Sequence, residues 1–236
     1  MSAFYKCTYR LFKQTLLSTI LFSLFFSIQT VYGQKNFEGI ITFQIESQSN
    51  NAQKMMYYVK GNKVRMEMEM PGTAAGMSPT IIYDNESNKM YTLISQMKSY
   101  MEIPINLSEQ EADSSNQIDD NDKPVKTGKT EKIAGVECEQ WLIKTDDGET
   151  ELWNAKGFGN FLFVQNNAFM KRNRHQPEWL KDIMKEGFFP FRIISKDQDG
   201  NMDMKMEVTD VKAENLSASL FEIPSGYNKM NIPGRE

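Results

Sequence analysis

Residues 53–70 read "QKMMYYVKGNKVRMEMEM", and residues 202–206 read "MDMKM". In the first stretch, apolar and polar residues alternate on both sides of Gly61-Asn62, which is a two-residue hairpin signal. Closing that turn sets apolar residues opposite one another on one face, as the pairs Val59–Val64, Tyr57–Met66 and Met55–Met68. The charged residues fall on the other face: Lys63, Arg65, Glu67 and Glu69. This period of two predicts an antiparallel hairpin that is buried on one side.

The second methionine stretch belongs to a hairpin of the same kind. Residues 188–211, "FFPFRIISKDQDGNMDMKMEVTDV", turn at Asp199-Gly200. This register predicts the inward pairs Phe191–Val208, Ile193–Met206 and Ser195–Met204, and the outward pairs Arg192–Glu207 and Lys196–Asp203. Opposite charges that face each other across strands stabilise a sheet by about 0.2–1 kcal/mol per pair. We therefore expect the even-numbered side chains of 64–70 and 202–208 to face one water-poor space.

Seven further segments have a strand-like pattern, with turn signals between them: 37–46, 80–84, 90–95, 99–103, 129–133, 136–145 and 149–154. With the two hairpins they make about eleven strands, near the size at which an open, twisted sheet curls. We expect a mainly β protein with some α, built on a single curved antiparallel sheet in the form of a half-barrel.

Two stretches interrupt the strand pattern. Residues 104–128 are acidic and contain no aromatic residue, which is typical of a mobile loop. Residues 159–187 favour helices over 159–172 and 176–187, the second with Pro177 in its first turn and Gly187 just past its end. We expect this segment to cover the concave face as a helical lid.

The first 33 residues have the pattern of a secretory signal peptide. Lys6, Arg10 and Lys13 precede an apolar run over 15–28, which is shorter than the ~20 residues of a membrane-spanning helix. We predict cleavage after about Gly33, leaving 34–236 as a single domain without a stable membrane anchor. The protein is then exported, to a bacterial periplasm or to the outside of the cell.

The charge balance narrows the range of partners. The chain has 27 basic and 31 acidic residues, and without the three leader bases the net charge is −7. An acidic protein of this kind is poorly suited to nucleic acid, whose binding depends on basic side chains. Cys138 is the only cysteine outside the leader, so we expect no intramolecular disulfide.

No catalytic or metal-binding pattern stands out. His175 is the only histidine, it lies between the two expected helices, and no nucleophile-elbow motif accompanies it. Residues 197–203, "DQDGNMD", place Met202 where a calcium loop requires glycine and Val208 where it requires glutamate. We expect a protein that is not an enzyme, with no cofactor and no metal site of these types.

Several segments resemble a known family: "FEGIITFQI", "YYVKGNKVRMEME", "IIYDNESNKMYTLISQMKSY", "KIAGVECEQWLI" and "LFEIPSGY". Their order is similar to that in the DUF4412-type family of exported bacterial proteins and, more distantly, in LolA-type lipoprotein carriers and their LolB-type relatives. The resemblance implies a curved antiparallel sheet whose concave side carries helices and holds acyl chains or other apolar ligands. The carriers have a lysine-arginine-proline element where this chain has Lys60-Gly61-Asn62, so the resemblance implies the fold rather than lipoprotein delivery.

The expected function is the binding of an apolar ligand, a lipid or a lipoprotein acyl chain, on the concave face. The expected lining residues are Met55, Tyr57, Val59, Val64, Met66, Met68, Phe191, Ile193, Met204 and Met206, with Trp179, Leu180, Ile183 and Met184 from the lid. Methionine is flexible and polarisable and therefore suits variable ligands. Two alternatives stay open: a module that binds another envelope protein, with its hollow filled by the lid, and a copper(I) binder that uses soft thioether ligands.

Overall fold

The fold is described from a computed structural model of the chain. It describes residues 37–48, 52–69, 78–104, 123–145, 148–159, 161, 187 and 189–230. Every described residue belongs to one compact unit of the chain, Gly33–Glu236. The expected signal peptide, residues 105–122 of the expected loop and almost all of the expected helical lid lie outside the described residues.

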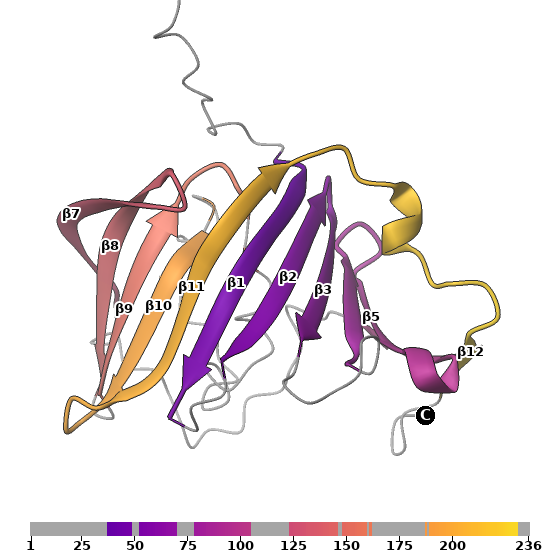
Figure 1. Cartoon of the computed structure of the whole chain (residues 1–236), viewed down its shortest axis with the longest axis horizontal. Coiled ribbons are helices and arrows are strands. Elements are labelled where there is room, and N and C mark those ends of the chain that lie inside the picture. Colours follow the sequence, from indigo (N-terminus) through magenta and orange to yellow (C-terminus); the bar gives the residue numbers. More distant parts are fainter. Residues whose placement is uncertain are drawn as a thin grey trace, which may run out of the picture. The chain divides into compact units, whose positions relative to one another are not determined.

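The described residues form one twelve-stranded sheet (Figure 1). Its strands are β1 (Gly39–Ser47), β2 (Gln53–Lys60), β3 (Lys63–Glu69), β4 (Thr80–Asp84), β5 (Lys89–Ile94), β6 (Ser99–Pro104), β7 (Val125–Ile133), β8 (Val136–Thr145), β9 (Gly148–Ala155), β10 (Phe189–Asp197), β11 (Met202–Ala213) and β12 (Asn228–Lys229). Two 3₁₀ turns, η1 (Ser95–Met97) and η5 (Ala218–Phe221), are the only helical elements among the described residues.

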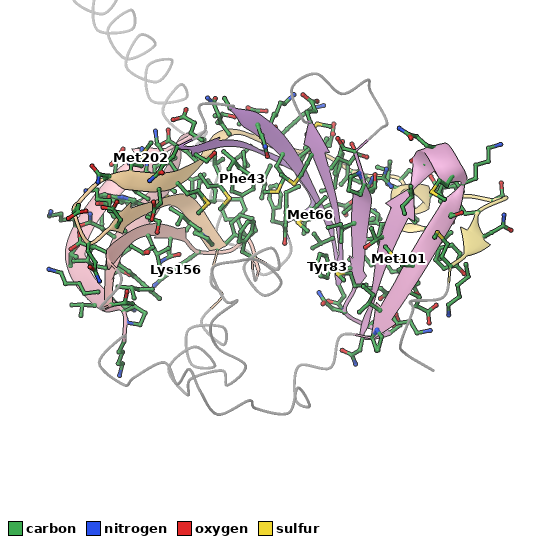
Figure 2. All side chains as sticks on the ribbon, turned by 90° about the horizontal axis from the view of Figure 1, so that it is seen from below. Phe43, Met66, Tyr83, Met101, Lys156 and Met202 are labelled. Atoms are coloured by element: carbon green, nitrogen blue, oxygen red, sulfur yellow. The ribbon has the colours of Figure 1, made fainter. Side chains whose placement is uncertain are left out.

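The strand order is β12-β6-β5-β4-β3-β2-β1-β11-β10-β9-β8-β7. All neighbouring strands pair antiparallel, except that β12 runs parallel to β6. The sheet therefore consists of two meanders, β1–β6 and β7–β11, which the long-range pair β1–β11 joins. Figure 2 shows this sheet bent into an arch.

The predicted strands are confirmed, and three of them match to the residue: β2, β4 and β8. The register of the β2–β3 hairpin is confirmed as well, with Val59 opposite Val64, Tyr57 opposite Met66, and Met55 opposite Met68. Gly61 has a φ of 56°, a left-handed conformation that glycine adopts without steric cost and that this tight turn requires.

One predicted pair in the second hairpin is wrong. Lys196 pairs with Met202 instead of Asp203, because a β-bulge lies between Ser195 and Lys196. The turn is wider than the predicted Asp199-Gly200 turn, since the Asp197 carboxylate accepts hydrogen bonds from the backbone N–H of Asn201 at 2.8 Å and from its side chain at 3.0 Å.

The bulge also changes the second methionine run. Met202 is 40% exposed and does not face the water-poor side, where it was expected. Beyond the bulge the prediction is confirmed, because Ile193 pairs with Met206, Ser195 with Met204, and Arg192 with Glu207.

Two strand features differ from the sequence prediction. β7 begins at Val125, inside the stretch expected to be a loop, and its pairing with β8 shifts register between Lys126 and Thr130. Gly128 lies in this irregularity with a φ of 78°. The shift interrupts the alternation of apolar and polar residues, so the first half of the strand carries no period-two pattern. β12 has only two residues, too few to show any pattern.

Most of the main core lies on one side of the sheet, which we call the inner face. Figure 2 shows Phe43, Met66 and Tyr83 on the inner side of the arch, and all three belong to the main cluster of buried apolar residues. Strand geometry sends successive side chains to opposite sides. The odd-numbered residues of β2 are accordingly more buried than its even-numbered residues, which are partly or fully exposed.

The C-terminal segment 214–230, which we call the C-terminal strap, crosses the opposite side, the outer face. The Arg65 guanidinium donates a hydrogen bond of 2.9 Å to the carbonyl of Leu220, and η5 lies against β3. The segment ends at the edge of the sheet, where β12 pairs with β6 (Figure 1). Four apolar residues are buried outside the main cluster: Ile82, Leu93, Leu216 and Phe221. The strap thus gives the outer face of this half of the sheet an apolar cover of its own.

Candidate functional site: the inner face of the sheet

The strand registers align inner side chains in rows that cross the sheet. One row runs from β1 to β6 through Ile41, Tyr57, Met66, Ile81, Thr92 and Met101. The next runs from β2 to β6 through Val59, Val64, Tyr83, Met90 and Ile103. Directly opposed residues share a face, so these rows form one apolar surface broken only by a threonine.

The expected lining residues on the strands come together on this surface. Eight are buried in the main cluster: Met55, Tyr57, Val59, Val64, Met66, Phe191, Ile193 and Met206. Met68 and Met204 are partly buried and pack against the cluster. The expected lid residues Trp179, Leu180, Ile183 and Met184 lie outside the described residues. The ligand-binding role of the whole set stays a prediction.

Two aromatic residues that the sequence analysis did not assign lie on the inner face. The Phe161 ring centroid lies 5.3 Å from those of both Phe43 and Tyr57, and the Phe158 centroid lies 4.9 Å from that of Phe191. Both residues follow β9 and are buried. The protein therefore covers the part of the inner face over β10, β1 and β2 with its own side chains, which we call the aromatic plug (Phe158 and Phe161).

The chain can return to the sheet here because Gly157 and Gly159 have φ values of 91° and 77°. A sequence signal for the plug exists in retrospect, since two phenylalanines three positions apart lie among glycines directly after a strand. The sequence analysis expects a helix over 159–172 instead, which is why the plug was missed.

The inner face over β4–β6 is less covered. Its apolar side chains are only partly buried, and we call them the β4–β6 patch: Ile81, Met90, Met101 and Ile103. The strand alternation that would have revealed these residues is weak, because Leu93 and Tyr91 on the outer face are apolar or aromatic too. The outer face of this half of the sheet is apolar as well because the C-terminal strap covers it, with Leu216 and Phe221 buried.

At its other end, over β7–β9, the inner face becomes polar. Trp141 Nε1 donates a hydrogen bond of 3.1 Å to Glu139, and the Lys126 ammonium lies 4.0 Å from the same carboxylate and 4.9 Å from the centre of the Trp141 ring. Asn154 lies directly opposite Glu139. We call these four residues the polar end of the inner face.

Asn154 is the unusual member of the polar end. It is 7% exposed, and its Nδ2 and Oδ1 atoms have no hydrogen-bond partner among the residues that the structure describes. Burying a polar group without a partner costs about 1–3 kcal/mol.

The outer face carries an ion-pair network centred on Arg192. Its guanidinium makes two hydrogen bonds to Glu131, of 2.9 and 3.0 Å, and another to Glu207, and it lies 5.8 Å from the Trp153 ring centre. Burial opposes the ionisation of Glu207, but hydrogen bonds from Arg192 and Lys205 outweigh it and hold the pKa of this carboxyl below its ordinary value. Because Glu131 belongs to β7 and Arg192 to β10, this network ties the edge of the sheet to its interior.

Other reactive groups are sparse in the part of the chain that is described. Within it, no three residues among His, Cys, Asp and Glu are arranged to hold a metal ion. Burial raises the pKa of the Cys138 thiol to about 12, which keeps it protonated and unreactive at neutral pH. The described helices are all too short to cross a membrane. The methionine-based copper site stays a prediction.

The chain belongs to the family described as "Domain of unknown function (DUF4412)", whose model matches residues 37–227. This confirms the resemblance that the sequence segments indicated. No curated protein matches the sequence.

The fold is similar to that of several solved structures. An uncharacterized conserved protein from Thermus thermophilus is 12% identical, with a TM-score of 0.49 over 84% of this chain and 94% of that one. MucB, solved with MucA from Pseudomonas aeruginosa, is 13% identical, with a TM-score of 0.40 over 78% of this chain and 54% of that one. A Vibrio parahaemolyticus domain assigned to outer-membrane lipoprotein sorting is 10% identical, with a TM-score of 0.33 over 81% and 90%.

Proposed function

We propose that this protein is an exported envelope protein that binds an apolar ligand, a lipid or a lipoprotein acyl chain, on the inner face of its sheet without catalysing a reaction. The observation that supports this most is the β4–β6 patch. It continues the buried apolar rows of β2 and β3, interrupted only by Thr92, yet its side chains are only partly buried. A contiguous apolar surface that stays only partly buried in the folded chain is typical of a binding site.

The energetics favour a long apolar ligand. Burying a chain of about fourteen methylenes contributes on the order of 11 kcal/mol at ~0.8 kcal/mol for each. Association and ordering oppose this with about 4–15 kcal/mol, so binding requires most of the chain to be covered. Met66, Met68, Met90 and Met101 suit that task, because their side chains adjust to ligands of different shape.

The aromatic plug narrows the expected site. Phe191 and Tyr57 are already in contact with Phe158 and Phe161, so a ligand adds to the core beside the plug or takes its place. Met68 on β3 is partly buried and packs against the main cluster, and the β4–β6 patch lies on the strands beyond it. We place the apolar part of the ligand there.

The test uses one substitution on the patch and a matched one away from it. Met101→Lys introduces a charge on the inner face, whereas Met97→Lys makes the same change in η1, where the side chain is 61% exposed. After removal of bound lipid, binding of the fluorescent hydrocarbon diphenylhexatriene is titrated. We expect Met101→Lys to lower the affinity at least tenfold, because a buried ammonium requires desolvation, and Met97→Lys to leave it unchanged.

Native mass spectrometry of the protein, purified from cell envelopes without detergent, supplies the second readout. The proposal predicts a co-purifying lipid. If no lipid accompanies the wild-type protein and the hydrocarbon probe does not bind, apolar ligand binding is rejected.

The aromatic plug also favours a second candidate, a module that binds another envelope protein and fills its inner face by itself. In that case lipid leaves the melting temperature unchanged, and the same native mass spectra show a protein partner in stoichiometric amount. The first candidate predicts the reverse, a melting temperature that rises with lipid concentration because only the folded state binds it.

A further inference from the structure

We propose that Asn154 anchors the head of the ligand, and that the ligand is an amphiphile with an uncharged head that both donates and accepts hydrogen bonds, such as a monoacylglycerol. This inference rests on the proposed function, since it assigns the end of the inner face that receives the head. The apolar tail then lies toward the β4–β6 patch.

The pairing of β9 with β8 places Asn154 on the inner face, whereas its pairing with β10 shifts register between Pro190 and Arg192 and does not decide the direction. Leu152, two residues earlier, lies opposite Trp141 on β8 and Ile193 on β10, and all three belong to the main cluster on the inner face. Because residues two apart on a strand share a face, Asn154 points to the same side. Its partner across the β8–β9 pair, Glu139, lies on that side too, together with Trp141.

The state of the Asn154 side chain indicates a missing partner. A primary amide offers two donors and an acceptor oxygen, and nearly all such groups are bonded when buried. Here the residue is 7% exposed and neither polar atom of its side chain has a partner among the described residues. Gln140 on β8 is a useful contrast, since it is similarly buried and its side-chain oxygen accepts a hydrogen bond of 2.8 Å from Thr127.

The neighbours of Asn154 define the kind of head. The side chains near Asn154 become more exposed toward β7: that of Glu139 is 32% exposed and that of Lys126 is 48% exposed. A head group can therefore approach Asn154 from the side of β7 and β8. Glu139 and Lys126 form an ion pair with each other, and Glu139 also accepts a hydrogen bond from Trp141. Their charges are compensated, so the site favours an uncharged head over an anionic or cationic one.

The two ends of the inner face lie several strands apart. From β9 to β4 there are six strand intervals, or about 29 Å along a flat sheet at ~4.8 Å per interval. Figure 2 shows the sheet arched, so the straight path across its inner side is shorter than the path along the sheet. An acyl chain with its head at Asn154 thus extends along the inner face toward the aromatic plug.

The test compares a ligand with a head and one without. Monolaurin has an uncharged head with hydroxyl groups and an ester, whereas diphenylhexatriene has no polar atom. Affinities for both are measured on the full chain for the wild type, Asn154→Leu, Asn154→Ala and the control Gln140→Leu. The quantity compared is the ratio of the monolaurin affinity to the diphenylhexatriene affinity.

We expect this ratio to fall about tenfold in both Asn154 variants, which corresponds to ~1.4 kcal/mol, and to stay at the wild-type value in Gln140→Leu. An unchanged ratio in the Asn154 variants overturns the inference while the proposed function stands. A loss of folding or of diphenylhexatriene binding in both variants overturns it too, because Asn154 is then a structural residue. Failure of the wild type to bind diphenylhexatriene contradicts the proposed function itself.

Discussion

At the residue scale, Arg192 shows what the sequence can and cannot specify. Its pair with Glu207 is predictable, because both residues lie on the outer side of one hairpin and their register follows from the apolar pattern. Its bidentate contact with Glu131 is not, since Glu131 lies on β7, three strands away, and the contact depends on how the sheet twists. The Arg192–Glu207 pair is local to one hairpin, whereas the Arg192–Glu131 contact depends on the tertiary structure.

Replacing Arg192 should destabilise the protein. Arg192→Met leaves Glu207 partly buried without its main partner, and we expect a loss of about 1–3 kcal/mol in the free energy of unfolding at pH 7. Urea denaturation measures it. The control is Lys144→Met, whose side chain is 72% exposed and pairs with Glu149, and which should change stability by less than about 0.5 kcal/mol.

The loss of unfolding free energy in Arg192→Met should decrease as the pH falls. Because the folded state holds the pKa of Glu207 below its ordinary value of 4.5, this carboxylate contributes stability above that pH and loses the contribution as the pH falls through the folded pKa. The difference between wild type and Arg192→Met should therefore shrink from pH 7 to pH 3. A difference that grows in acid contradicts the assigned ion pair.

At the element scale, the hairpins with unbroken alternation were predictable to the residue, and the irregular strands were not. The β2–β3 hairpin combines a period of two with a Gly-Asn turn, which together leave one register. The β10–β11 turn differs because the Asp197 side chain stabilises a wider loop, and a side chain that bonds the backbone leaves no hydrophobic pattern. The β4–β6 patch escaped prediction because both faces of these strands carry apolar or aromatic residues, and the aromatic plug escaped it because it lies outside the strands.

The C-terminal strap should contribute substantially to stability. Phe221 is 4% exposed in η5, so Phe221→Ala leaves a cavity on the outer face, and we expect a loss of about 3 kcal/mol. Ser219→Ala is the control within the same turn, since Ser219 is exposed. Thermal and urea unfolding report the difference.

The strap variant should also separate stability from binding. The substitution leaves the inner face unchanged, so diphenylhexatriene affinity below the melting temperature should equal that of the wild type. A loss of affinity in proportion to the loss of stability would mean that the probe binds on the outer face, under the strap.

At the scale of the whole molecule, the proposed function depends on one surface, the inner face of the sheet. Two meanders joined by β1 and β11 make a single arched sheet, and its inner face is apolar from β10 to β6, with polar residues gathered over β7–β9. The fold class, the strand registers and most lining residues of that face follow from the alternation of the sequence. The plug and Asn154 do not, because tertiary packing decides which inner side chains are covered and which are left without a partner.

The most direct measurement follows the methionine methyl groups by NMR in protein labelled with ¹³C at these methyls, during titration with diphenylhexatriene. The account predicts shifts for Met90 and Met101 on the inner face, and smaller or no shifts for the exposed Met97 and Met202, which serve as internal controls. Unchanged Met90 and Met101 signals at saturating diphenylhexatriene, or shifts confined to Met97 and Met202, would contradict it.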